Sequence, residues 1–146
     1  MKTILTALAL TIGAAMPAAA ELITVQSSKP VAETMDALEA AVGGAGATVF
    51  ARIDHTKGAA SVDLEMGDAQ TLIFGNPKLG TPAMQADLRA SLYLPLKVAV
   101  YEADGGSVLN YEDPAEMFSG LEIPADAKFV AMMQGALGKL TGKAAE

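Results

Sequence analysis

The 146-residue chain contains no cysteine and no tryptophan, and it has a single histidine, His55. Without cysteine, the protein can be neither a lipoprotein attached through a cysteine nor a small scaffold held by disulfides, so its stability has to come from packing. Aromatic residues make up only 5% of the chain, which leaves little material for a surface that stacks bases or sugars. These absences require a packed core and argue against nucleic-acid and sugar binding.

Positive charge is also scarce. The chain has 10 Lys and Arg against 17 Asp and Glu, a formal net charge of -7, and the basic residues form no cluster. Each contact with a phosphate backbone or an anionic lipid would work against the field of the whole molecule. We therefore expect no nucleic-acid partner and no binding to a membrane surface.

The first twenty residues have the pattern of an export signal. Lys2 gives a positive start, Ile4–Met16 is an apolar run, and residues 18–20 are alanines suited to cleavage. The apolar run is shorter than the roughly 20 residues that span a bilayer. We expect a cleaved signal peptide at 1–20, a mature domain of 126 residues at 21–146, a periplasmic or secreted location, and no membrane anchor after cleavage.

The first half of the mature chain predicts two strands around a helix. The strands are expected at 22–26 and 48–54, and the second alternates Val49, Ala51 and Ile53 on one face with Phe50, Arg52 and Asp54 on the other. Between them, Ser28 is the expected cap of a helix with apolar positions at helical spacing, which glycines end at 43–46. Residues 58–67 are predicted to be a weaker extended segment.

The second half predicts three strands and two helices. Strands are expected at 71–74, 97–103 and 107–111, the last two joined by the hairpin turn Asp104-Gly105-Gly106. Residues 75–80 are expected to be a loop, and Thr81-Pro82 to open a short helix near 82–91. An apolar stripe predicts an amphipathic helix at about 124–142 whose last residues, Gly142 to Glu146, fray.

This order predicts a single α+β domain. We expect a curved, mainly antiparallel sheet with two main helices packed on one face, in β-α-β(4)-α order, plus the short helix near 82–91. No repeat and no long linker divides the chain.

Three blocks of the sequence are more distinctive than the rest: Phe50-Ala-Arg-Ile-Asp-His55, the block from Leu72 to Gln85, and Leu94-Pro-Leu-Lys97. In residue identity and in order, these blocks resemble the small bacterial and archaeal family known as domain of unknown function 302. The resemblance runs from about Ser27 to Pro114. The resemblance implies an α+β architecture like that of the TATA-binding protein. It brings no activity with it, and a shared architecture does not imply DNA binding.

His55 is the candidate catalytic residue, because histidine titrates near neutrality and can act as acid, base or ligand. The alternative is a structural histidine at a strand end that is bonded to a loop carbonyl. Adjacent residues of a strand point to opposite faces, so Asp54 cannot orient His55 as in a triad. Glu102 with Asp54 and His55 would be a mixed nitrogen and oxygen site, but one histidine without cysteine predicts no metal and no other cofactor.

The segment from Gly75 to Thr81 is the second candidate. It joins a strand to a helix start, where backbone amides favour an anion, and Lys78 would add charge. It is not a P-loop, because no lysine stands between Gly80 and Thr81. The alternative is a tight turn in which Asn76 bonds its own backbone and Pro77 sets the angle.

The preferred hypothesis is a non-enzymatic exported module that binds a small ligand or a protein in a cleft between these two candidates. Its ligand-binding residues would be Asp54, His55, Asn76, Lys78, Gly80, Thr81 and Glu102. One alternative is an enzyme with His55 as acid or base and an anion held at Gly75–Thr81, although the chain lacks a nucleophile elbow, a cysteine nucleophile and a second histidine. Another is a self-associating structural or stress protein, such as a homodimer, that pairs through a strand edge.

Overall fold

The structure is a computed structural model that describes residues 22–146, and the expected signal peptide at 1–20 lies outside them. The strands are β1 (Leu22–Ser27), β2 (Thr48–Asp54), β3 (Ala69–Gly75), β4 (Leu96–Ala103) and β5 (Gly106–Glu112). The helices are α1 (Val31–Gly44), α2 (His55–Ala60), α3 (Pro77–Ala86), the 3-10 helix η1 (Leu88–Leu92), α4 (Pro114–Met117) and α5 (Lys128–Ala145). None of the helices within residues 22–146 is both long enough and apolar enough to cross a membrane.

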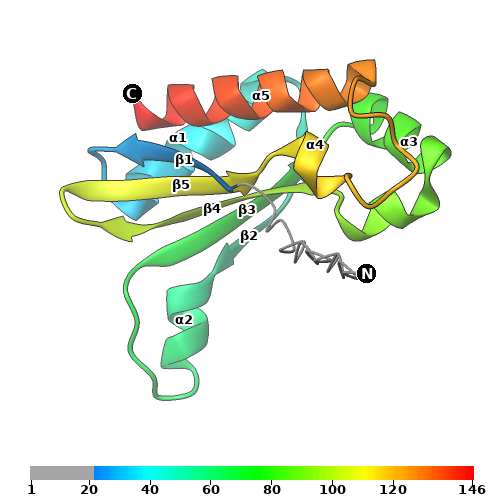
Figure 1. Ribbon diagram of the computed structural model, residues 1–146. Coiled ribbons are helices and arrows are strands. Elements are labelled where there is room, and N and C mark those ends of the chain that lie inside the picture. Colours follow the sequence, from blue (N-terminus) through cyan, green and yellow to red (C-terminus); the bar gives the residue numbers. More distant parts are fainter. Residues whose placement is uncertain (1–21) are drawn as a thin grey trace, which may run out of the picture.

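The predicted fold class is confirmed. The five strands form one antiparallel sheet in the order β1-β5-β4-β3-β2, and α1 and α5 lie together over one face of it (Figure 1). Neither edge strand, β1 or β2, pairs with a further strand of the described chain, so the expected homodimer stays a prediction.

The core lies between the sheet and these two helices. Alternate strand residues point toward the helices, and the helices present stripes of apolar side chains in return. The central buried side chains are Leu72, Phe74, Val98, Val100 and Leu109 from the sheet, and Met35, Leu38, Val42, Val130, Met133 and Leu137 from α1 and α5.

The predicted cap of α1 was wrong. Pro30 holds the N-cap position and gives no side-chain cap, and Ser28 takes no part. Ser27 instead turns inward, where its hydroxyl lies 3.1 Å from the Thr34 hydroxyl, which is 2.8 Å from the hydroxyl of Ser107. A buried chain of hydroxyls therefore joins β1, α1 and β5.

The predicted fraying of Gly142 to Glu146 was also wrong, because α5 continues to Ala145. Its terminal carbonyls have side-chain partners: the Ser27 hydroxyl donates to the Ala145 oxygen at 3.3 Å, and the Lys29 ammonium donates to the Ala144 oxygen at 3.3 Å. Such bonds supply partners that the last turn of a helix otherwise lacks.

A β-bulge in β2 changes which side chains face the helices. Val49 pairs with Phe74 and Ala51 pairs with Ile73, so Phe50 is an extra residue between two consecutive pairs. An extra residue reverses the alternation beyond it. The predicted division of β2 into two regular faces was therefore wrong.

Beyond the bulge, the Arg52 side chain lies on the face of the sheet that α1 covers, and the Ile53 side chain lies on the opposite face. The Arg52 guanidinium forms ion pairs with Asp36 and Glu39 of α1 and donates to Gln70 Oε1 at 2.8 Å. The bulge thus places a cation against the acidic edge of α1.

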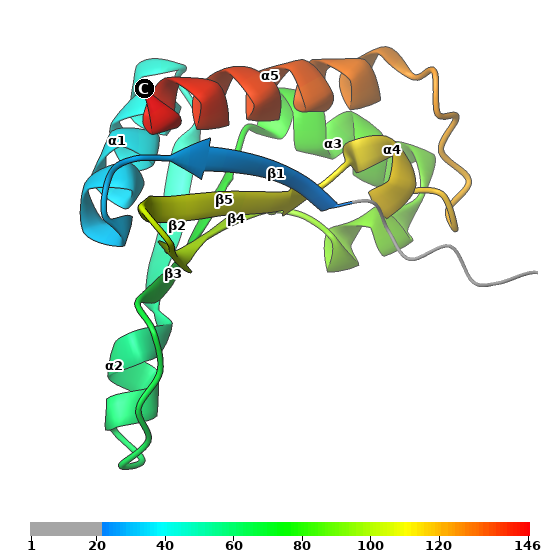
Figure 2. The same cartoon turned by 60° about the vertical axis from the view of Figure 1, so that its left-hand side comes forward.

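Residues 58–67, predicted to be extended, belong instead to an arm formed by residues 55–68. The arm starts with α2, and both views show it projecting from the sheet away from α1 and α5 (Figures 1 and 2). Asp54 caps α2 by accepting the Lys57 backbone N–H at 2.9 Å. No residue of α2 is buried, so local capping rather than an apolar stripe sets its structure.

Helix α3 begins earlier than predicted. Pro77 is its first residue, and the Asn76 side chain accepts the Lys78 backbone N–H at 3.0 Å. The turn predicted at Asn76 is therefore present, but the chain continues as helix through the segment expected to be a loop. Pro82, expected to start the helix, lies inside it.

The predicted hairpin is confirmed, with β4 and β5 joined at Asp104-Gly105.

Candidate functional site

The structure separates the two groups of predicted site residues. His55 follows β2, and Asp54 pairs with Gln70 at the start of β3, where the Glu102 backbone N–H also donates to Asp68. Asn76 follows the opposite end of β3, which is seven residues long. At roughly 3.3 Å per residue, the two ends lie about 20 Å apart. The single cleft expected between these groups does not exist, and one small substrate cannot contact both His55 and the segment Gly75–Thr81.

The groups at the arm end have partners within the protein. The Lys57 backbone N–H and ammonium both bond to Asp54 and hold the pKa of its carboxyl below the usual value. Glu102 Oε2 accepts the Asp68 backbone N–H at 3.2 Å. His55 Nε2 lies 2.9 Å from the Thr71 hydroxyl, so its partner is a strand hydroxyl and not the loop carbonyl considered from sequence. These bonds anchor the base of the arm.

No group of three or more His, Asp or Glu side chains in residues 22–146 is placed to hold a metal ion. Asp54, His55 and Glu102 therefore do not form the mixed site considered from sequence.

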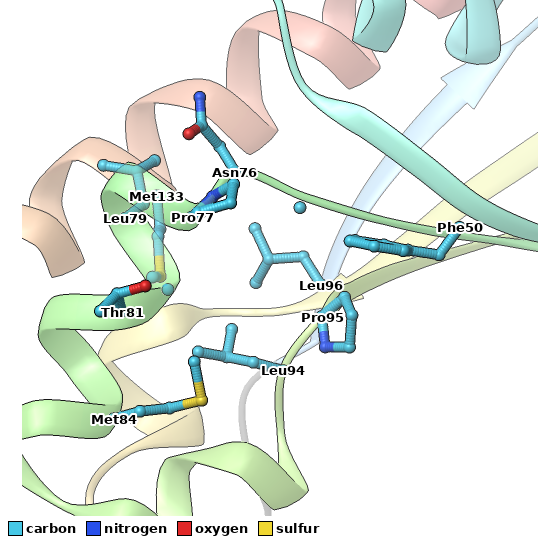
Figure 3. A pocket seen from close by; sticks show the side chains of 12 residues that line it. Phe50, Asn76, Pro77, Leu79, Thr81, Met84, Leu94, Pro95, Leu96 and Met133 are labelled. Atoms are coloured by element: carbon cyan, nitrogen blue, oxygen red, sulfur yellow. The ribbon is translucent and has the colours of Figure 1, made fainter.

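At the other end of β3 lies a cavity of about 330 Å³, which we call the Phe50 pocket (Figure 3). Its lining consists of Phe50, Gly75, Asn76, Pro77, Leu79, Gly80, Thr81, Met84, Leu94, Pro95, Leu96 and Met133. Three predicted ligand-binding residues, Asn76, Gly80 and Thr81, are among them. Lys78 is exposed and does not line the pocket.

Residues from both layers of the fold build the Phe50 pocket, including Gly75 at the end of β3 and Leu96 at the start of β4. The bulge in β2 supplies Phe50, α3 supplies one wall, the segment entering β4 supplies Leu94 and Pro95, and α5 supplies Met133. In Figure 3, the Phe50 ring and Pro95 lie across the space from the α3 residues Thr81 and Met84. Phe50 remains 58% exposed, so the pocket has an opening at this ring.

The lining is chemically uniform. It contains no charged side chain, and its polar side chains are the Asn76 amide and the Thr81 hydroxyl. Such a pocket favours an uncharged, mainly apolar molecule with one or two polar groups.

Sequence reasoning missed the apolar members of this site. The sequence patterns indicate no ligand-binding role for Phe50, Met84 or Leu94. A usable indication was nevertheless present, because every lining residue except Met133 belongs to one of the three distinctive sequence blocks. Three separate segments between Phe50 and Leu96 thus meet at one cavity.

The sequence matches the family described as "Domain of unknown function DUF302" over residues 23–140. The protein belongs to the DUF302 family. The DUF302 match extends beyond the range of about 27–114 expected from the sequence blocks, and it includes most of α5 and hence Met133.

A solved DUF302 structure has the same fold. The crystal structure of an uncharacterized conserved protein DUF302 from Bacillus stearothermophilus superposes with a TM-score of 0.77, at 21% sequence identity, over 84% of this chain and 97% of that one. At this level of identity the comparison shows the fold alone.

Relatives from Brucella species carry functional names. The chain is 36% identical over 117 residues to a protein of Brucella suis named "Fluoride-specific ion channel FluC 1", with 78% of this chain and 46% of that protein covered. The corresponding protein of Brucella abortus gives the same identity, with 43% of its length covered. The chain thus spans less than half the length of the curated relatives it matches.

Proposed function

We propose that this DUF302 protein is an exported, non-enzymatic module that binds a small, mainly apolar molecule in the Phe50 pocket. The observation that carries the proposal is the convergence of the three distinctive sequence blocks on one cavity. A volume of about 330 Å³ lies at the lower end of the range of small-molecule sites. The export part of the proposal comes from the pattern of residues 1–20.

The lining defines the class of ligand. Because no charged side chain faces the cavity, an ionised group would lose its hydration without gaining a partner. The Thr81 hydroxyl can donate to a ligand carbonyl or ether oxygen. Met84 and Met133 have flexible side chains that adapt to ligands of different shape. The expected ligand is therefore a compact, uncharged molecule with a single polar end.

The test uses the neutral fluorophore prodan, which is apolar apart from one ketone and one tertiary amine. Gly80 lines the pocket, and a Cβ built there would lie 3.7 Å from Leu94 Cδ1, an ordinary contact. Gly80→Leu should fill the cavity, whereas the matched control Gly80→Ala adds only one methyl group.

We expect saturable prodan fluorescence with the wild type and with Gly80→Ala, and loss of at least ten-fold in affinity with Gly80→Leu. Equal binding by all three proteins would place prodan elsewhere and refute the pocket assignment. Circular dichroism of each variant checks that the fold is intact.

The Brucella relatives support a second candidate, a role beside fluoride transport. Fluoride is a small anion that needs cations or N–H donors around it, and the Phe50 pocket presents no charged side chain. We therefore assign such a role to a contact with a transport protein, and not to fluoride binding in this pocket. Sodium fluoride should leave the melting temperature unchanged relative to sodium chloride at equal ionic strength; a fluoride-specific rise would contradict this assignment.

A further inference from the structure

The sheet opens between two of its central strands. The β4–β5 ladder runs from Ala103↔Gly106 to Ala99↔Asn110 and stops there. Both strands continue beyond this point with their other neighbours, since Leu96 still pairs with β3 and Glu112 still pairs with β1. Strands β4 and β5 therefore diverge past the pair Ala99↔Asn110.

A cavity of about 340 Å³ lies at this divergence, and we call it the β4–β5 cleft. It is on the face of the sheet opposite α1 and α5, because its lining residues Thr71, Lys97 and Tyr101 alternate with the buried, helix-facing residues of β3 and β4. His55, the most suggestive residue of the sequence, lies beside the cleft through its contact with Thr71. The cleft shares no residue with the Phe50 pocket.

The cleft contains an amide without an internal partner. Within residues 22–146, Asn110 Oδ1 is the buried side-chain polar atom that has no hydrogen-bond partner. An amide that the protein does not hold by hydrogen bonds can turn to present either its oxygen or its N–H groups. A buried, unpaired amide costs stability, and a ligand that bonds to it would remove that cost.

Two opposite charges line the cleft without meeting. Lys97 of β4 and Glu112 of β5 both line it, yet neither takes part in any of the four ion pairs within the described residues. They stand on the two strands that diverge. Leu22 and Met117 add apolar surface next to them.

We propose that the β4–β5 cleft binds a free apolar α-amino acid. Its carboxylate would pair with the Lys97 ammonium, its ammonium group with the Glu112 carboxylate, and its side chain would lie against Leu22 and Met117. The Asn110 amide would bond to either end of the zwitterion. A simple carboxylate fits less well, because Glu112 and the net negative charge of the protein would repel it.

The test is a titration of the ¹⁵N-labelled protein with L-leucine, followed by NMR through the amide signals of Lys97, Asn110 and Glu112. Two analogues of leucine each keep one charged group and lack the other: 4-methylpentanoate lacks the ammonium group, and 3-methylbutylamine lacks the carboxylate. We expect saturable shifts with leucine, at least ten-fold weaker binding of both analogues, and at least ten-fold weaker leucine binding by Lys97→Met. The exposed-lysine control Lys139→Met should bind leucine as the wild type does.

Three results would overturn the proposal: no saturable shift with leucine, equal binding of either analogue, or unchanged binding by Lys97→Met. The variant Gly80→Leu separates this proposal from that for the Phe50 pocket. It should lose prodan and still bind leucine, whereas loss of leucine binding in that variant would assign leucine to the Phe50 pocket.

The variant Asn110→Leu distinguishes a ligand-binding role of Asn110 from a structural one, through its melting temperature and its affinity for leucine. Because the amide oxygen has no partner in the protein, replacing it with an apolar group of similar size should leave the melting temperature equal to or above that of the wild type. The same variant should bind leucine more weakly. A lower melting temperature together with unchanged leucine binding would show that Asn110 serves the fold and not the site.

Discussion

The substitution Gly80→Ala tests whether α3 extends through the segment that the sequence predicted to be a loop. Gly80 lies in the first turns of α3, and its backbone N–H donates to the Asn76 oxygen at 3.0 Å. Replacing glycine with alanine inside a helix stabilises the protein by about 0.5–1 kcal/mol. The added Cβ would meet Leu94 Cδ1 at 3.7 Å, which is an ordinary contact and brings no clash.

Gly80→Ala should therefore raise the free energy of unfolding by up to about 1 kcal/mol, which corresponds to roughly 3–5 °C in melting temperature for a domain of this size. Urea unfolding monitored by circular dichroism measures the change. The control is Gly43→Ala in α1, where a Cβ would meet nothing within 4 Å. Destabilisation by Gly80→Ala with stabilisation by Gly43→Ala would refute the helical assignment of residue 80.

Three further predictions concern the fold. Asp87 accepts hydrogen bonds from the Arg89 guanidinium and from the Arg89 and Glu122 backbone N–H groups, which hold the pKa of its carboxyl well below the usual value. A lowered folded-state pKa adds stability that is complete above the unfolded pKa of about 3.9 and is lost progressively as the pH falls from there through the folded-state pKa. The difference in unfolding free energy between wild type and Asp87→Asn should therefore be largest at pH 7 and smaller at pH 3, and an equal difference at the two pH values would contradict this. Gly106→Ala should lower the free energy of unfolding by at least about 2 kcal/mol, because a Cβ at this position would lie 2.1 Å from the Ser27 carbonyl oxygen. If urea unfolding gave this variant the same free energy of unfolding as the wild type, the close approach at Gly106 would be refuted. Lys29→Met should speed amide hydrogen exchange in the last turn of α5, since the Lys29 ammonium donates to the Ala144 oxygen, and unchanged exchange would show that this bond does not hold the helix end.

The sheet and the two main helices were predictable because their apolar periodicity is regular and their turns contain glycine. The strand pattern of residues 48–54 predicted the bounds of β2 correctly. It could not predict the bulge at Phe50, because an inserted residue is defined by the partner strand and leaves the alternation of the sequence unchanged. The bulge determines that Arg52 faces α1 and that Phe50 lies at a pocket.

The wrong cleft came from joining two candidate sites without tracing the direction of the strands that lead to them. His55 follows the strand expected at 48–54, and Asn76 follows the strand expected at 71–74. These two strands pair antiparallel in the structure, so His55 and Asn76 lie at opposite ends of β3.

The Phe50 pocket could be predicted only in part. Asn76, Gly80 and Thr81 were chosen for polar chemistry, whereas the cavity is mainly apolar. Apolar residues such as Met84 and Met133 look like ordinary core in a sequence, and only the packing of α3 against β4 and α5 shows that they surround a space.

The most direct test of the central claim is the intact mass, under native conditions, of the protein isolated without chelators from its host. Wild type and Gly80→Leu are expressed and measured side by side. The Phe50 pocket predicts that the wild type carries a reproducible extra mass of one small organic molecule and that Gly80→Leu carries none. An identical spectrum for the two proteins, whether bare or loaded, would contradict the claim that this pocket binds the ligand.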